Sequence, residues 1–330
     1  MKHFTLGYRD ISAPNHWRRI EPGTDFFDSA IILNFGGNQN IQEEQANGYA
    51  KNIESILPNH IRSKIKICSV AYNQELVDSS LSRIMITKDA TAACDRFYKD
   101  YILPLLYVDK YQKQIKSRKG IEKTLQSITI IAHCGGCMVA DRVLSNLSDT
   151  LQENDIVKSQ KELDNLMKKI QLVGYAPYQK IDQNINSLYI APPDDFESTF
   201  ATILRGMEYE KDVEYPPKFI ATYRRNINSA MPRDIVREFI DKFNEPITVR
   251  KGSSVLMIPP KFTHSFECIS SAPRSKKESI RHSGEKIAHV IHLFAQNSIA
   301  AFANRPYGID KNAVYDIISG SEAGDSGASI

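Results

Sequence analysis

Features that define several classes of protein are missing from this sequence. No run approaches the roughly 18 apolar residues of a membrane-spanning helix, and the first residues, MKHFTLGYRD, lack the apolar core of a signal peptide. The 42 basic and 39 acidic residues leave a net charge of only +3, which gives no clear signal for a nucleic acid or a membrane surface as partner. We therefore expect a soluble, intracellular protein, cytoplasmic by default, without a transmembrane segment.

Cysteine is also scarce, and its spacing is irregular. Five cysteines in 330 residues form no regular framework, and a chain of this length can bury a large core without disulfides. A reducing compartment is the simplest interpretation. The small-residue, acidic C-terminus would also fit a secreted effector exported by a bacterial system that needs no signal peptide, although tails of this kind are common.

What the sequence does contain is an alternation of short apolar runs and amphipathic segments. Residues 30–35 form a continuous apolar run that ends at two glycines, as expected of a strand buried on both faces. Asn40 and Glu43 can cap a following helix, and Thr87 can cap the next one. Alternation of this kind predicts a mostly parallel sheet with helices on both faces, an α/β fold. The predicted strands cover residues 30–35, 65–72, 128–132 and 170–176, and the predicted helices lie around 46–57, 88–106 and 137–147.

The second half is less regular. Apolar runs predict further strands at 188–191, 219–223 and 255–258, and the last helix is predicted over 285–303. Helical segments and a Pro-Pro pair between about 196 and 250 indicate a cap inserted into the domain. The predicted organisation is an N-terminal extension over 1–27, a domain over 28–305, and a C-terminal tail over 306–330 that is flexible from about 319.

The strongest chemical signal lies at the end of the third predicted strand. There the chain reads Ala132-His133-Cys134-Gly135-Gly136, which places a nucleophilic residue between a buried strand and a buried helix. Small residues two positions before and after the nucleophile suit a sharp, strained turn. The helix N-terminus favours a thiolate at Cys134, and the N–H of Gly135 can donate to a developing oxyanion.

This pentapeptide resembles the nucleophile elbow G-x-S-x-G of the α/β-hydrolase family, with Ala132 for the first glycine and Cys134 for serine. The order of elements extends the resemblance over roughly residues 28–300. The resemblance implies an acyl-transfer enzyme whose second oxyanion donor comes from the loop after an early strand. Here that loop contains Gly36, Gly37 and Asn38, although an ordinary strand-ending turn explains the same residues equally well.

The resemblance also implies that an acid and a histidine follow the nucleophile in chain order, each in a loop after a strand. Asp194 and Asp195 follow the run at 188–191, and His264 follows the run at 255–258. His264 would act as the base, and either aspartate would orient it. His282, expected just before the last helix, is the alternative base, and Asp182 and Asp234 are alternative acids. His133 is expected to be structural or to line a substrate pocket.

Two other interpretations stay open. Cys134 could be an inert, buried turn residue on a catalytically silent, hydrolase-like interaction protein. Cys134 and Cys137 form a C-x-x-C pattern, which would also suit a dithiol redox protein. His289 and His292 share one helix face, but no neighbouring ligand completes a metal site. We therefore predict a cysteine-dependent acyl hydrolase or acyltransferase that acts through an acyl-thioester on a small-molecule or protein acyl substrate, without a metal or other cofactor.

Overall fold

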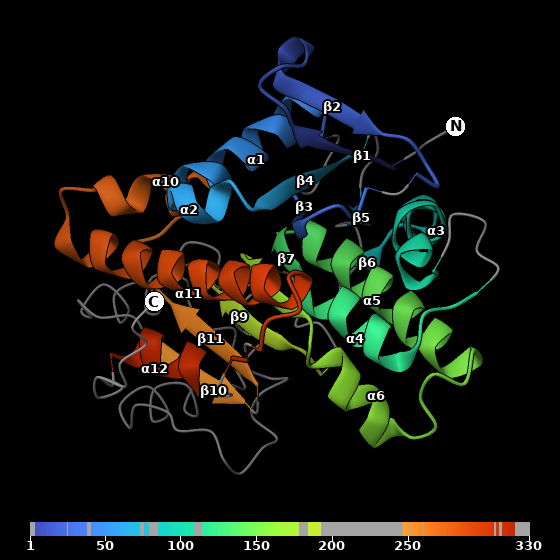
Figure 1. The fold of residues 1–330 in the computed structure, drawn as a ribbon. Helices are drawn as coiled ribbons and strands as arrows, with labels where there is room; N and C mark the ends of the chain where they lie inside the picture. Colours follow the sequence, from blue (N-terminus) through green and yellow to red (C-terminus); the bar gives the residue numbers. More distant parts are fainter. Residues whose placement is uncertain are drawn as a thin grey trace.

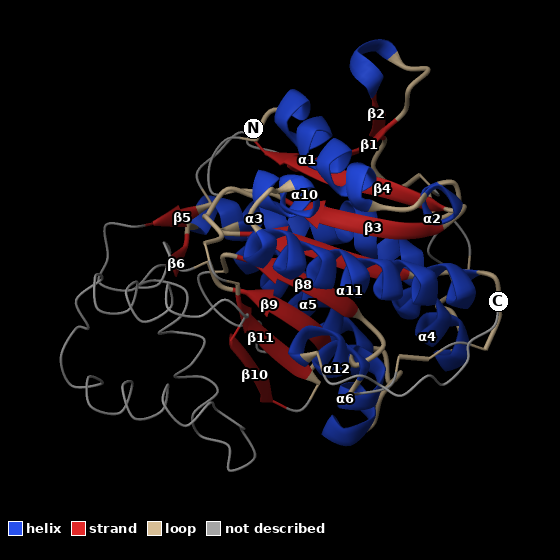
Figure 2. Cartoon of the chain, turned by 90° about the vertical axis from the view of Figure 1, so that its left-hand side faces the viewer, coloured by secondary structure: helices blue, strands red, loops and turns tan. Residues whose placement is uncertain are grey.

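The computed structural model describes residues 4–24, 26–37, 41–72, 76–78, 85–108, 114–177, 184–192, 247–251, 253–259, 261–306, 308–309 and 312–320. Their strands form a nine-stranded sheet in the order β10-β11-β9-β8-β7-β3-β4-β1-β2 (Figure 2), and β5 and β6 form a separate pair. The strands are β1 (Phe4–Arg9), β2 (Trp17–Ile20), β3 (Ala30–Phe35), β4 (Ile65–Tyr72), β5 (Val77–Asp78), β6 (Met85–Ile86), β7 (Ile128–His133), β8 (Gln171–Tyr175), β9 (Asn186–Ile190), β10 (Ile247–Lys251) and β11 (Ser254–Ile258).

The strands from β4 through β3, β7, β8 and β9 to β11 pair in parallel, and antiparallel strands lie at both edges. The prediction of a mostly parallel α/β sheet is therefore confirmed. Two predicted strands, 30–35 and 65–72, have the same bounds in the structure as β3 and β4.

Helices cover both faces of the sheet (Figure 1). One face carries α3 (Lys88–Phe97), α4 (Arg118–Gln126), α5 (Gly136–Glu153) and α6 (Gln160–Met167), and the other carries α1 (Glu43–Ile56), α2 (Asn59–Arg62), α10 (Glu267–Ser271), α11 (Glu278–Phe302) and α12 (Ala313–Ser319). Shorter helical turns are η1 (Pro14–His16), the π-helix η2 (Tyr98–Ile102), η3 (Leu103–Leu106) and η6 (Ala272–Arg274).

Each face of the sheet has its own hydrophobic core. In β3, Ile31, Leu33 and Phe35 belong to the core beneath α3–α6, whereas Ala30 and Ile32 belong to the core beneath α1 and α11. This division follows from the alternation of side chains along a strand. It explains why the central strands are apolar at every position rather than at every second one.

Helix ends follow local capping chemistry. The Thr87 side chain accepts a hydrogen bond from the N–H of Ala90, which confirms Thr87 as the cap of α3. The cap of α1 is Gln42, which forms a capping box with Gln45, whereas the predicted cap Asn40 lies outside the described residues. The last long helix, α11, begins at Glu278, seven residues before the predicted start at 285.

The segment expected as an N-terminal extension is part of the sheet. β1 pairs with β4 and β2 pairs with β1, both antiparallel. The physical reason is burial, because Phe4 and Leu6 complete the core next to β4. The expected tail also contributes α12, whose Val314 and Ile318 are buried, while residues 321–330 lie outside the described part.

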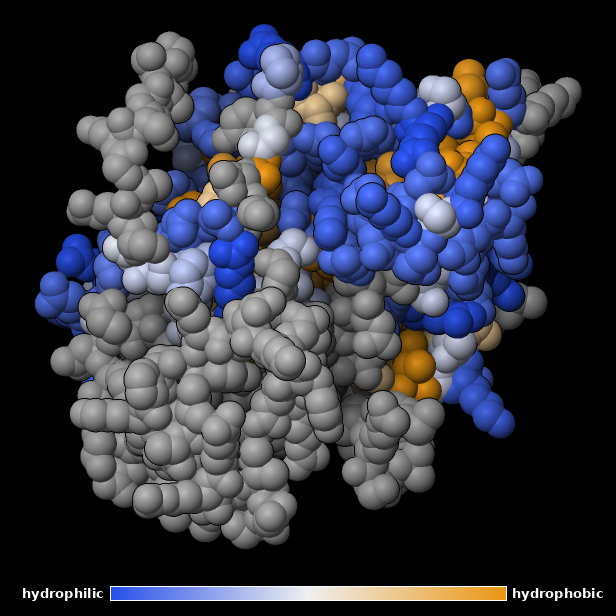
Figure 3. Space-filling model, turned by 90° about the horizontal axis from the view of Figure 1, so that it is seen from below, coloured by the Kyte–Doolittle hydropathy of each residue, from blue (hydrophilic) through white to orange (hydrophobic). Residues whose placement is uncertain are grey.

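The predicted cap at about 196–250 and the predicted strand at 219–223 fall largely outside the described residues. At the end of that interval, Ile247–Lys251 form the edge strand β10 and belong to the sheet. None of the described helices combines the length and hydropathy that crossing a membrane requires. On the face shown in Figure 3 the described surface is mainly hydrophilic, with hydrophobic atoms confined to small areas.

Candidate functional site

Cys134 lies at the turn between β7 and α5, where the chain changes from strand to helix. Its N–H donates to the carbonyl of Tyr175 at 2.9 Å, so the residue continues the pairing of β7 with β8. Its carbonyl accepts from the N–H of Cys137 at 3.0 Å, which begins the helical hydrogen bonding. Joining both patterns requires a φ of 54° at Cys134, a left-handed conformation that costs energy for a residue with a Cβ.

Gly136 brings the start of α5 against the end of β3. A Cβ atom at Gly136 would overlap the carbonyl oxygen of Phe35, which is main chain and cannot rotate away. The small residue that the sequence pattern requires after the nucleophile therefore has a visible steric cause. Through this approach the turn at Cys134 lies directly beside the loop that follows β3.

The strand order changes direction at this point. From β3 the chain crosses through α1 to β4 on one side, then returns to β7 on the other side of β3 and continues through α5 to β8. In open α/β sheets, ligands bind outside the carboxyl ends of the strands where such a reversal occurs. The carboxyl ends of β3 and β7 border that position.

The loop after β3 is shaped by two tyrosines. Gly36 packs so closely against the ring of Tyr49 that a Cβ there would collide with it. Gly37 has a φ of 62°, and its carbonyl accepts a hydrogen bond from the hydroxyl of Tyr72 at 3.0 Å. Gly37 thus has a fixed backbone beside the Cys134 turn, while Asn38, the other residue predicted in this loop, lies outside the described residues.

His133 connects Cys134 with the segment that carries His264. Its Nε2 lies 2.9 Å from the backbone oxygen of His264, and its Nδ1 lies 3.2 Å from the hydroxyl of Tyr49. The rings of His133 and His264 have centroids 5.0 Å apart. The structure therefore brings His264, the predicted base, against His133, the residue directly before the predicted nucleophile.

Comparison with models of known protein families gives no match for this chain, and comparison with curated proteins gives none either.

The two cysteines of the C-x-x-C pattern have different surroundings. Cys134 is 1% exposed and Cys137 is fully buried in the first turn of α5, and the two are thiols rather than a disulfide. Burial raises the pKa of the Cys137 thiol well above its usual value, and the neighbouring Cys134 raises it further. Cys137 is therefore a poor source of thiolate, which disfavours a redox pair at these positions.

The other predicted residues divide into two groups. Asp194 and Asp195 lie outside the described residues, as do Asp182 and Asp234; the described end of the preceding strand is at Ile190 in β9. His282 lies within α11 rather than before it, because that helix begins at Glu278. The prediction that an aspartate orients His264 therefore rests on the sequence alone.

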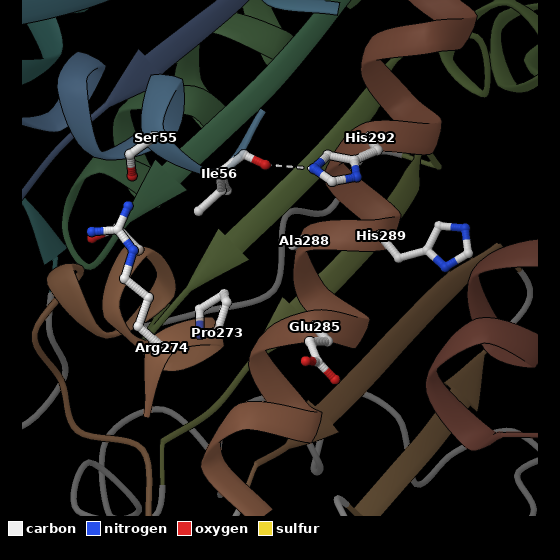
Figure 4. Close-up of a pocket in the computed structure, with 9 residues that line it drawn as sticks. Ser55, Ile56, Pro273, Arg274, Glu285, Ala288, His289 and His292 are labelled. Atoms are coloured by element: carbon white, nitrogen blue, oxygen red, sulfur yellow. Dashed lines mark hydrogen bonds between the residues drawn. The ribbon is translucent and has the colours of Figure 1, made fainter. Parts of the chain in front are cut away.

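His289 and His292 line a surface pocket of about 290 Å³ (Figure 4). Their rings point in different directions, and Nε2 of His292 bonds the carbonyl of Ile56 at 2.6 Å. No cluster of three metal-ligating side chains occurs in the described part of the chain. The pocket is lined by Ser55, Ile56, Ser270, Pro273, Arg274, Glu285, Ala288, His289 and His292.

Tyr49 and Phe266 belong to the site, although sequence analysis did not select them. Phe266 packs against Tyr49 and His133, with ring centroids 5.1 and 5.6 Å apart. In the sequence, Tyr49 is one more apolar position of an amphipathic helix. Its contact with His133 joins residues 84 positions apart, and local pattern carries no signal for such a pairing.

Proposed function

We propose that this chain is a cysteine-dependent acyl hydrolase or acyltransferase with an α/β-hydrolase-like fold, in which Cys134 is the nucleophile. The observation that carries the proposal is the left-handed φ of Cys134 at the carboxyl end of β7. Such strain persists where the surrounding structure imposes it, and it is concentrated at functional sites. A glycine would adopt this conformation without steric cost, whereas the Cβ of Cys134 makes it unfavourable.

In the proposed reaction His264 removes the proton from Cys134, and the sulfur attacks the acyl carbon of the substrate. The negative charge that develops on the acyl oxygen is stabilised by the N–H of Gly135 and by the loop containing Gly37 and Asn38. The bond to the leaving group then breaks, and the leaving group takes the proton from His264. Water, or another acceptor, attacks the resulting thioester and releases the enzyme.

Three features support these roles. Cys134 lies directly before the first turn of α5, which begins at Gly136, and the dipole of a helix favours negative charge at its N-terminus. The loop after β3 lies against the start of the same helix through the contact between Phe35 and Gly136. The backbone of His264 is bonded to His133, the residue directly before the nucleophile. Asp194 or Asp195 is proposed to orient His264, by analogy with the family.

The burial of Cys134 favours one competing function, a binding protein on the same scaffold. A side chain that is 1% exposed must become accessible before it attacks a substrate. Thiol reactivity separates the two proposals, because the native fold accelerates an activated nucleophile and protects an inert one.

The experiment is the alkylation of native and urea-unfolded protein by iodoacetamide between pH 6 and 8, with the adduct located by mass spectrometry. Cys268 is partly exposed while the other four cysteines are buried, so the measurement is made in a Cys268→Ser background. The proposal predicts that Cys134 reacts faster in the native protein than in the unfolded one. It also predicts that His264→Gln slows this reaction.

Cys137→Ala is the matched control, because it removes the neighbouring thiol and leaves the proposed nucleophile. Its effect on the labelling of Cys134 should be small. If Cys134 is labelled only after unfolding, the enzyme proposal fails and the binding function is favoured. If Cys134 and Cys137 form a reversible disulfide instead, the redox interpretation replaces it.

A further inference from the structure

We infer that His133 is a positioning residue, which holds the backbone of His264 against the end of β7 through a neutral imidazole whose proton is on Nε2. This inference rests on the proposed function, in which His264 is the base. It gives the positioning of His264 to His133, a side chain that takes no part in the proposed reaction. His133 is the last residue of β7 and is only 5% exposed.

The two hydrogen bonds of His133 determine where its proton lies. The backbone carbonyl of His264 can only accept, so Nε2 of His133 must carry the proton across the 2.9 Å contact. In a neutral ring Nδ1 is then an acceptor, and the hydroxyl of Tyr49 donates to it at 3.2 Å. Burial raises the pKa of Tyr49 to about 12, with smaller contributions from Cys134 and Glu267, so the hydroxyl keeps its proton at neutral pH.

Tyr49 and His133 together connect the three segments of the proposed site. The ring of Tyr49 packs on Gly36 in the loop after β3. His133 precedes the nucleophile and bonds the backbone of His264. Phe266, two residues after His264, packs on both rings. A change at either hydrogen bond is therefore transmitted to the segment that carries the base.

Positioning of this kind affects rate more than binding. A displacement of about 1 Å in a catalytic group can cost on the order of 100-fold in rate. A proton moved from Nε2 to Nδ1 of His133 would break the bond to the carbonyl of His264, whereas a second ring proton would only reverse the bond to Tyr49, whose hydroxyl can also accept. We therefore expect variants of Tyr49 and His133 to lower kcat while KM for an acyl substrate changes little.

The experiment compares two substitutions at His133 with one at Tyr49. His133→Gln keeps an N–H that can reach the carbonyl of His264, whereas His133→Phe keeps the ring volume and removes the donor. Tyr49→Phe removes only the hydroxyl. The acylation rate of Cys134 by an activated thioester should fall about 10- to 100-fold in His133→Phe and clearly less in His133→Gln.

A second measurement does not depend on Cys134 chemistry. Imidazole nitrogen NMR in histidine-labelled Cys134→Ala protein should show His133 as a neutral ring with its proton on Nε2. In Tyr49→Phe the proton should stay on Nε2, because the carbonyl of His264 still accepts from it. Hydrogen exchange of the amides at 263–269 should be faster in His133→Phe than in His133→Gln.

The outcomes distinguish the two proposals. If Cys134 is acylated as fast in His133→Phe as in the wild type, or if NMR finds the His133 proton on Nδ1, the positioning role is overturned and the enzyme proposal survives. If the NMR and exchange results hold but no variant forms an acyl adduct, the proposed function fails while the hydrogen-bonding of His133 stands. If the acylation rate falls equally in His133→Gln and His133→Phe, the hydrogen bond is not what matters, and the positioning role is overturned in favour of simple packing.

Discussion

At the scale of single residues, Cys134 has a backbone conformation that a residue with a Cβ atom disfavours. The φ of 54° is natural for glycine, and the short sequence pattern around Cys134 was sufficient to predict a strained turn. The pattern could not predict the partners of His133, because His264 lies 131 positions away. Contacts of that range depend on strand order, which a five-residue pattern does not contain.

The strain at Cys134 predicts an unusual order of stabilities. Cys134→Ala and Cys134→Gly remove the same sulfur, but only glycine relaxes the left-handed backbone. We expect the glycine variant to be more stable than the alanine variant by about 1 kcal/mol, because a Cβ in this region costs ~1–2 kcal/mol and glycine loses some of that gain in chain entropy. Urea unfolding of both variants measures the difference, and a less stable glycine variant would show that the turn is unstrained.

At the scale of elements, the central strands could be predicted because both of their faces are buried. Residues 30–35 and 65–72 are apolar almost throughout and have the predicted bounds. The edge strand β2, Trp17–Ile20, was not predicted, because only Ile20 in it is buried. The start of α11 was placed too late for a similar reason: its first turns are rich in polar and charged residues.

The close approach of α5 to β3 predicts the effect of a single methyl group. Gly136→Ala should destabilise the protein by about 1–3 kcal/mol, because the added atom meets the Phe35 carbonyl and forces the helix away from the strand. Gly48→Ala is the control, since Gly48 lies exposed in α1 with no atom near its missing Cβ. That variant should gain up to about 1 kcal/mol from helix propensity. Equal effects at the two positions in thermal unfolding would contradict the contact.

At the scale of the whole molecule, the alternation of strands and helices predicted the fold class but not the strand order. The central strands run parallel, so their carboxyl ends and the loops that follow lie at one edge of the sheet. This explains why residues selected separately from sequence, Cys134, Gly37 and His264, lie at one edge of the sheet. The acid of the proposed triad and the predicted cap belong to intervals that the described residues do not cover.

The packing of α11 against α1 predicts how stability depends on pH. Burial lowers the pKa of His292 below its usual 6.5, although the bond to the Ile56 carbonyl opposes the shift. The unfolded chain therefore takes up this proton more readily than the folded one. The stability linked to His292 is complete above about pH 6.5 and is lost as the pH falls through the folded-state pKa.

Urea midpoints at pH 7.5 and 5.5 test this linkage. The wild type should lose stability over this interval, and His292→Gln should lose less, because glutamine does not titrate. His289→Gln, which changes an exposed histidine on the adjacent turn, serves as the control; it should lose nearly as much stability as the wild type, because His289 lowers the pKa of His292 less than burial does. Identical losses in both variants would exclude His292 as the source.

The most direct test of the central claim is to trap an acyl group on Cys134. The protein is mixed with an activated acyl thioester, quenched in acid and digested, and the modified peptide is identified by mass spectrometry. We predict an adduct with the mass of the acyl group on Cys134, present in Cys137→Ala, absent in Cys134→Ala, and formed about 100- to 10,000-fold more slowly in His264→Gln. An adduct confined to the partly exposed Cys268, or no adduct at all, would contradict the assignment of Cys134 as a catalytic nucleophile.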